Sequence, residues 1–233
     1  FANIPSGPAR PPVDVTEAPF DSVRRAEVEE KFGTLPGIAI GYRAPERRTP
    51  DWYALAMLDQ ALHGGRAGRI HRELVLEQQI AVDTSGGIHY PVGDLFDYNG
   101  PTLMVSRLLY KPEVSDDQAL AAYDAVLDAV REKGIESEEL DECKVKFRSD
   151  YMSNLEGGHG AYIPRYGLMH LMACFTLFDG DPTLVNSILD GFLAVTTEEV
   201  RKVAQKYLDP NRRAMVIRKP LASKPTEMSS EKG

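Results

Sequence analysis

The chain has 233 residues, of which 42% are hydrophobic, so it is long enough to bury one substantial core or two small ones. Its 35 acidic residues outnumber its 27 basic residues, which gives a formal net charge of −8, and the basic residues are scattered. Nucleic-acid binding relies on clustered Lys and Arg, so no nucleic acid is expected as a partner. The longest apolar runs, such as Tyr53–Leu58, are far shorter than the roughly 20 residues that cross a bilayer, and no membrane span is predicted.

The two ends of the chain differ in composition from its middle. Prolines are concentrated in residues 1–22, where each removes a backbone donor and keeps its neighbour extended, so this segment is predicted to be an interdomain linker. The chain begins at Phe1 without an initiator Met, which suggests a piece of a longer polypeptide. The polar residues 221–233 are predicted to form a disordered tail. A single domain is therefore expected over residues 23–220.

Alternating polar and apolar residues predict the strands of this domain. The stretches "RRAEVEEKF" and "PGIAIGYRA" alternate on either side of "GTLPG", which is typical of an antiparallel hairpin. Two further strands are predicted at "IAVDTSGGIHY" and "GPTLMVSRLLY", and a last one at "RAMVIRK".

Apolar residues at helical spacing predict helices after the second strand and again after the fourth. Thr49 and Pro50 are typical of a helix start, and Gly64 and Gly65 end that helix. The further predicted helices are "RIHRELVLEQ", Ser115 to Gly134, Ser137 to "EGGHG", "LMHLMACFTLF", Leu184 to Leu193 and Thr197 to Tyr207. The order of the elements favours an α+β fold with a mostly antiparallel sheet covered on one face by helices.

The sequence contains no recognised hydrolytic zinc motif. Such sites place two histidines and a glutamate on one helix, as H-E-x-x-H or H-x-x-E-H, and the histidines at positions 63, 71, 89, 159 and 170 fit neither pattern. Surface or half-buried polar contacts are predicted for each. Cys143 and Cys174 are expected to be small buried apolar groups, and a disulfide between them stays open. No metal ligand is predicted in this chain.

Two segments leave an alternative open. Glu156 and His159 are three residues apart, as in carboxylate-bridged metal bundles, but those sites need two such motifs. The neighbouring glycines each weaken a helix by roughly 1 kcal/mol, so a flexible break is favoured. Residues Asp94–Pro101, "DLFDYNGP", combine aromatic residues with Asp and Asn and could touch a substrate; a structured hairpin loop is the favoured interpretation.

Several stretches, in this order, resemble one known family. They are "FANIPSGPARPPVD", "LPGIAIGYRAP", "DWYALAMLDQALHGGRAGRIHRELVLEQQIAV", "GDLFDYNGP", "LFDGDP" and "VAQKYLDPNRRAMVIRKP". Together they resemble the second, inactive domain of bacterial pitrilysin/insulinase-type zinc metallopeptidases, which are related to mitochondrial processing peptidase. The resemblance extends from Phe1 to about Pro220.

The resemblance implies that the catalytic zinc lies in a different domain from this chain. In that family two homologous α+β domains form a half, and two halves close around an unfolded peptide. The zinc lies in the first domain of one half, on an H-x-x-E-H helix with a distant Glu, and none of these residues has a counterpart here. The resemblance therefore implies that this chain holds no cofactor, and that zinc belongs to a catalytic domain outside it.

The resemblance also concerns substrate contact. The second domain of the opposite half usually supplies an Arg and a Tyr, seven residues apart, that hold the scissile peptide. Aligning "LVLEQQIAV" with that family places Val75 at the Arg position and Val82 at the Tyr position, so both contact residues are replaced. A shifted alignment would make Arg69, Arg72 or Tyr90 the substrate-contact candidates.

The expected function follows from these implications. The chain alone is predicted to be inactive, as the non-catalytic C-terminal domain of a zinc metalloendopeptidase. It would form part of the peptide-enclosing chamber and of the interface with the catalytic first domain of the same polypeptide. A homologous partner subunit or a second copy would supply the other half, peptides would be the substrates, and the resemblance suggests the periplasm or cell envelope. The alternative is a standalone, catalytically dead scaffold or assembly protein of the same fold.

Overall fold

A computed structural model describes residues 14–157 and 166–221, together with Gly7 and Pro11. Half of the predicted linker and nearly all of the predicted tail lie outside the described residues, and so does His159. Within the described ranges, none of the helices is both long and apolar enough to span a bilayer.

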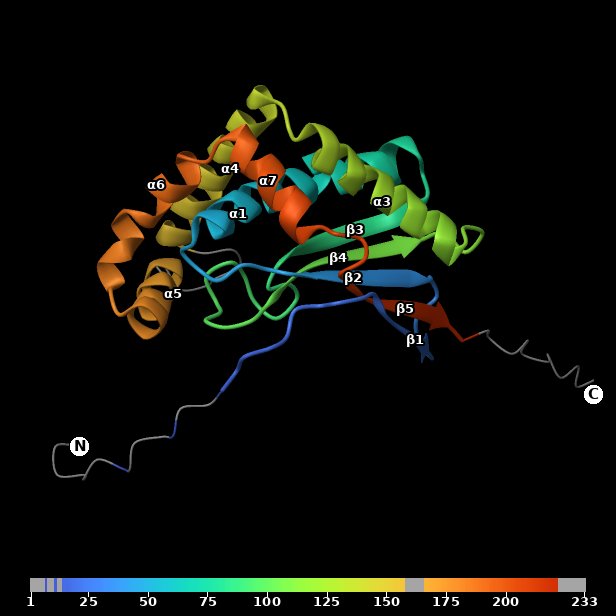
Figure 1. Ribbon diagram of the computed structural model, residues 1–233, viewed down its shortest axis with the longest axis horizontal. Coiled ribbons are helices and arrows are strands. Elements are labelled where there is room, and N and C mark those ends of the chain that lie inside the picture. Colours follow the sequence, from blue (N-terminus) through green and yellow to red (C-terminus); the bar gives the residue numbers. More distant parts are fainter. Residues whose placement is uncertain (1–6, 8–10, 12–13, 158–165, 222–233) are drawn as a thin grey trace, which may run out of the picture.

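Five strands form one sheet in the order β1-β5-β2-β4-β3 (Figure 1). The strands are β1 (Arg24–Glu30), β2 (Gly37–Arg43), β3 (Ala81–Ile88), β4 (Leu103–Tyr110) and β5 (Ala214–Pro220). The pairs β5–β2, β2–β4 and β4–β3 are antiparallel, whereas β1 runs parallel to β5. The predicted α+β class with a mostly antiparallel sheet is confirmed.

The predicted hairpin of the first two strands is wrong. The last strand, β5, lies between β1 and β2 and pairs with both of them. Strand β2 is buried along almost its whole length, so it gains most from a neighbour on each side, whereas β1 is exposed and suits the edge of the sheet. The sequence pattern located both strands, but their pairing depended on a strand more than 170 residues further along the chain.

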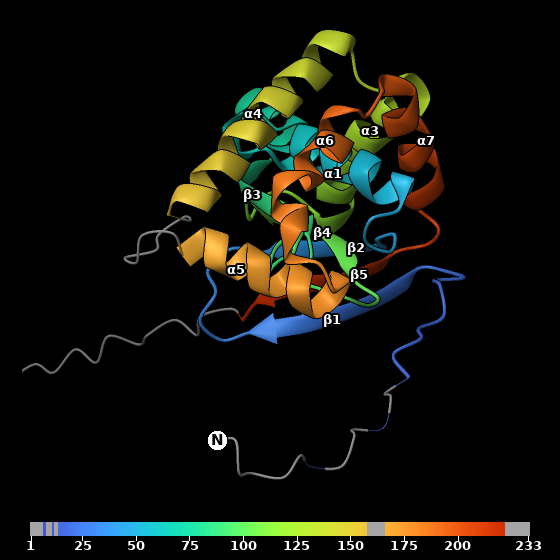
Figure 2. The same cartoon turned by 90° about the vertical axis from the view of Figure 1, so that its left-hand side faces the viewer.

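The helices lie on one side of the sheet, as two perpendicular views show (Figures 1 and 2). The longer ones are α1 (Pro50–His63), α3 (Asp116–Lys133), α4 (Ser137–Glu156), α5 (Tyr166–Cys174) and α7 (Thr197–Tyr207). Shorter helical segments are η1 (Gly65–Ala67), α2 (Arg69–His71), η2 (Arg72–Glu77), η3 (Phe175–Asp179), η4 (Pro182–Asn186) and α6 (Ile188–Leu193). The single helix predicted from Leu184 to Leu193 is thus two segments that meet at Ser187.

The core lies between the sheet and the helices. Ile38, Ile40 and Tyr42 of β2 point toward the helices and are at most 1% exposed. Trp52 of α1 is fully buried, and its ring lies 5.0 Å from that of Phe192 and 6.0 Å from that of Phe96, centroid to centroid. The loop that carries Phe96, between β3 and β4, is therefore anchored in the same core as α1 and α6.

Candidate functional site

The three predicted substrate-contact residues have different polar partners. Arg69 on α2 donates from Nε to Glu139 of α4 over 2.7 Å, and this hydrogen bond raises the pKa of the guanidinium. Arg72 is half exposed and lies 3.8 Å from carboxylate oxygens of Glu73 and Glu77, within its own helical segment. Each arginine thus has acidic neighbours, and a role in substrate contact stays a prediction for both.

Tyr90 follows β3, and its hydroxyl lies 3.1 Å from Ser85 Oγ. It lines a cavity of about 330 Å³ together with His63. At the two positions where the resemblance expects Arg and Tyr, Val75 is half buried against the core and Val82 is 48% exposed on the edge strand β3. The structure does not bring Arg69 and Tyr90 to one polar cluster, so the substrate-contact prediction stays open at each position.

His63 lies at the centre of a hydrogen-bond chain that links α1, β4 and α3. Its Nδ1 is 2.6 Å from Asp59 Oδ1, its Nε2 is 2.7 Å from Ser106 Oγ, and Ser106 Oγ is 2.9 Å from the Tyr123 hydroxyl. A carboxylate only accepts, so Nδ1 donates to Asp59; in the neutral ring Nε2 then accepts from Ser106, which accepts from Tyr123. Burial raises the pKa of Tyr123 well above its ordinary value and keeps this donor protonated.

Hydrogen bonds join Asp59, His63 and Ser106 in the order of a catalytic triad, but the serine hydroxyl is too deeply buried to act as a nucleophile. Ser106 is 1% exposed, and its oxygen is engaged by both His63 and Tyr123. The 330 Å³ cavity is lined by Asp59 and His63 and not by Ser106, so a carbonyl entering it would not meet the hydroxyl. The chain of hydrogen bonds therefore ties helices to the sheet and offers no accessible nucleophile.

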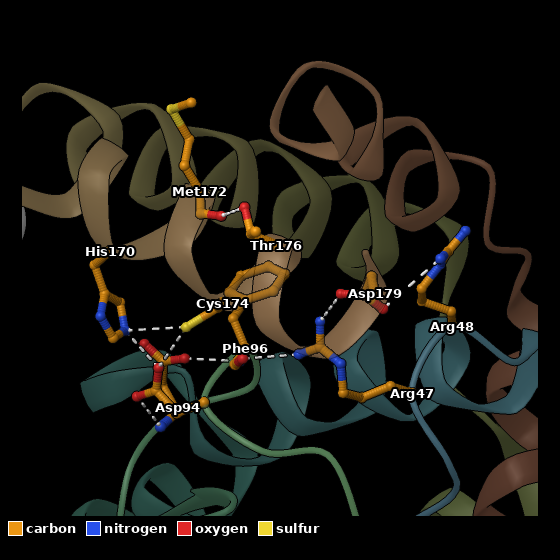
Figure 3. Close-up of polar contacts among 10 residues, drawn as sticks. Arg47, Arg48, Asp94, Phe96, His170, Met172, Cys174, Thr176 and Asp179 are labelled. Atoms are coloured by element: carbon orange, nitrogen blue, oxygen red, sulfur yellow. Dashed lines mark hydrogen bonds and ion pairs between the residues drawn. The ribbon is translucent and has the colours of Figure 1, made fainter. Parts of the chain in front are cut away.

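A second cluster joins the β3–β4 loop to α5 (Figure 3). His170 Nε2 lies 2.5 Å from Asp97 Oδ1, and Cys174 Sγ lies 3.7 Å from each of these two atoms. His170 and Cys174 are four residues apart, so α5 presents both on one face, toward the loop. An imidazole, a thiol and a carboxylate in this arrangement are a ligand set for a metal ion.

The surroundings hold Asp97 in place. The Phe96 ring packs 5.7 Å from the ring of Phe175, the residue after Cys174. Arg47 donates to the Phe96 carbonyl over 2.7 Å and to Asp179 of η3 over 2.6 Å, and so joins the loop to the segment that follows α5 (Figure 3). Asp97 Oδ2 accepts the backbone N–H of Asp94 over 3.1 Å, which leaves Oδ1 for the cluster.

The electrostatics of the cluster reflect its partial burial. Burial, followed by the charge of Asp97, raises the pKa of the Cys174 thiol to about 11, so the free thiol is neutral at physiological pH. Burial also raises the pKa of Asp94, and the neighbouring Asp97 adds to this shift. Cys174 and Cys143 are both buried free thiols, as predicted for small apolar groups.

Sequence reasoning missed this cluster. The predicted polar contact of His170 is confirmed, whereas Cys174 was expected to be a buried apolar group or to form a disulfide with Cys143, and both thiols are free. The H-x-x-x-C spacing of His170 and Cys174 in a predicted helix was the available signal; Asp97, 73 residues before His170, gave none. The loop Asp94–Pro101 is structured, as favoured, and contributes Asp97. Of the alternative metal pair, Glu156 ends α4, whereas His159 lies outside the described residues.

The comparisons with known proteins point to one family. The profile described as "Peptidase M16 inactive domain" matches residues 1–147. The "Zinc protease PqqE" of Helicobacter pylori is 24% identical over 204 residues, which cover 86% of this chain and 42% of that protein. The chain therefore spans about half the length of this relative.

Solved structures share the fold. A protease from Helicobacter pylori matches with a TM-score of 0.78 at 21% identity, over 92% of this chain and 48% of the other. A peptidase M16 inactive domain from Pseudomonas fluorescens matches with a TM-score of 0.72 at 17% identity, over 96% and 50%. The inactive peptidase domain of a putative zinc protease from Bordetella parapertussis matches with a TM-score of 0.67 at 20% identity, over 85% and 97%.

Proposed function

Because this chain belongs to the Peptidase M16 inactive domain family, we propose that it is the non-catalytic second domain of a zinc metalloendopeptidase. In this role it forms part of the wall of a peptide-enclosing chamber and part of the interface with a catalytic first domain. The single observation that carries the proposal is the family match over residues 1–147. The catalytic zinc belongs to that first domain, in line with the name of the zinc protease relative, which is more than twice as long as the matched region.

The sheet offers a surface for this role. Among the described residues, the helices leave the other face of the sheet uncovered along β5 (Figure 1). Val216 of β5 is 40% exposed there, flanked by Ala39 of β2 on one side and Ala26 of β1 on the other. Small side chains keep this row flat, so an extended peptide or an apposed domain can approach the sheet closely.

The N-terminal approach covers the other end of the same face. The Arg43 guanidinium lies 4.7 Å from the centre of the Phe20 ring and forms an ion pair with Glu17. Phe20 itself is 7% exposed. The described part of the segment before β1 is therefore fastened across one end of β2, and it does not cover the row around Val216. We assign this open row to the chamber wall.

The test uses the full polypeptide to which this domain belongs. Val216→Asp places a charge on the open face, and we expect it to lower kcat/KM for an unfolded protein substrate about tenfold while zinc content and folding stay normal. Val145→Asp is the matched control, because Val145 is a 71% exposed valine on α4, on the helical side. If Val145→Asp impairs cleavage and Val216→Asp does not, the chamber lies on the other face.

A standalone scaffold is the second candidate function, since a putative zinc protease from Bordetella pertussis is covered over 97% of its chain by this one domain. The same preparation separates the two candidates. Peptide hydrolysis by the full polypeptide that disappears on chelation supports the peptidase domain, and a folded polypeptide without any hydrolysis supports the scaffold.

A further inference from the structure

We propose that Asp97, His170 and Cys174 form a binding site for one zinc ion within this non-catalytic domain. The site is separate from the catalytic zinc discussed above and does not depend on the proposed function. It also departs from the sequence-based prediction that the chain holds no metal ligand.

Two of the three distances between the ligand atoms fit tetrahedral zinc. With Zn–S near 2.3 Å and Zn–N or Zn–O near 2.0 Å, tetrahedral angles place sulfur about 3.5 Å from each lighter ligand atom. Cys174 Sγ lies 3.7 Å from both His170 Nε2 and Asp97 Oδ1. The His170–Asp97 separation of 2.5 Å has to widen to about 3.3 Å, which requires side-chain movement of about 0.8 Å in total.

The donor set selects the class of metal. Thiolate and imidazole favour Zn²⁺ and related transition metals, whereas Mg²⁺ and Ca²⁺ take oxygen ligands. On binding, the Cys174 sulfur coordinates as thiolate and its proton leaves to solvent. Three protein ligands satisfy three of the four positions, and water supplies the fourth.

A backbone hydrogen bond orients one ligand of the site, and two of the ligand side chains are partly exposed to solvent. The Asp94 N–H holds the outer oxygen of the Asp97 carboxylate over 3.1 Å, which orients Oδ1 toward the cluster. The side chains of His170 and Asp97 are 39% and 26% exposed, whereas Cys174 is buried behind them. A metal ion would therefore approach from the solvent side of His170 and Asp97.

Native mass spectrometry of the 233-residue chain, first stripped with a chelator and then mixed with one equivalent of zinc, tests the proposal. We expect one zinc per chain, and a thiolate-to-metal charge-transfer band when Co²⁺ replaces Zn²⁺. His170→Gln and Cys174→Ala should each weaken zinc binding by roughly 100-fold or more, since even the loss of a supporting contact costs 10- to 100-fold.

Two controls keep the result interpretable. Cys143→Ala removes the other buried cysteine, and His71→Gln removes a histidine whose partner is Thr84, so both variants should bind zinc normally. His170 is partly exposed, so its variant is expected to fold, which circular dichroism checks. Absence of bound zinc in the unmodified chain, or undiminished affinity in folded Cys174→Ala, would overturn the proposal.

Discussion

Ser106 is the residue whose environment most resembles a catalytic one, and its burial predicts a structural role. Ser106→Ala leaves His63 Nε2 and the Tyr123 hydroxyl without the oxygen that joins them. We expect the free energy of unfolding to fall by about 1–3 kcal/mol, the usual cost of an unsatisfied buried polar group. Urea unfolding measures this loss. Ser85→Ala on β3, where the hydroxyl has one half-buried partner, should change it by less than about 0.5 kcal/mol.

The same residue allows a direct check on chemistry. A fluorophosphonate probe labels an activated, accessible serine, and we expect no labelling of Ser106 in the folded chain because only 1% of the residue is exposed. Labelling at Ser106 that is abolished by His63→Gln would show that the hydroxyl becomes accessible and that the hydrogen-bond chain acts as a triad.

Strand β3 comes close to the His63 ring at Gly86. A Cβ at Gly86 would come within 2.6 Å of the His63 ring, so glycine is required for the imidazole to reach Ser106. Local patterns in the sequence predicted a strand with glycines at this point, and they predicted a polar contact for His63. They could not predict Asp59, His63, Ser106 and Tyr123 as one chain, because three separate elements supply its members.

At the scale of elements, the loop between β3 and β4 depends on one of two adjacent arginines. Arg47 and Asp179 form a pair at 2.6 Å with side chains 4% and 6% exposed, whereas Arg48 lies 3.7 Å from the same Asp179 and is 44% exposed. We expect Arg47→Ala to lower the free energy of unfolding by about 3–5 kcal/mol. The substitution leaves the buried carboxylate of Asp179 and the Phe96 carbonyl without the guanidinium that donates to both. Arg48→Ala should cost less than about 1 kcal/mol.

Thermal unfolding of the two variants side by side measures this difference. Equal losses for Arg47→Ala and Arg48→Ala would mean that the loop is held by the Phe96 ring alone. Because Asp97 adjoins Phe96, folded Arg47→Ala is also expected to bind zinc more weakly than Arg48→Ala.

Helix starts were predictable from the sequence, and strand partners were not. Thr49, Ser115 and Thr196 each accept a hydrogen bond from the first turn of the following helix, and such capping depends on residues within four positions. The pairing of β1 with β5 depends instead on which strand β2 needs as a second neighbour. Local alternation carries no information on that choice, and the hairpin prediction was wrong for this reason.

At the scale of the molecule, the family resemblance deduced from ordered sequence stretches is confirmed, and so is the α+β fold. Order along the chain, rather than any single motif, identified the family. The domain boundaries predicted at residues 22 and 220 stay predictions, since half of the first end segment and nearly all of the last lie outside the described ranges.

The buried apolar residues form one connected cluster that includes α1, α3, α4, α6, α7 and the sheet. We therefore expect the 233-residue chain to unfold in a single cooperative step. Trp52, the only tryptophan, is fully buried against Phe192 of α6 and reports on the centre of the cluster, whereas circular dichroism reports on all helices. Urea unfolding followed by both signals should give coincident transitions.

If helix is lost at a lower urea concentration than the Trp52 signal changes, α4 and α5 unfold separately, and the Asp97–His170–Cys174 cluster opens before the sheet does. Added zinc should then move the early transition toward the later one, since a ligand stabilises only the state that binds it.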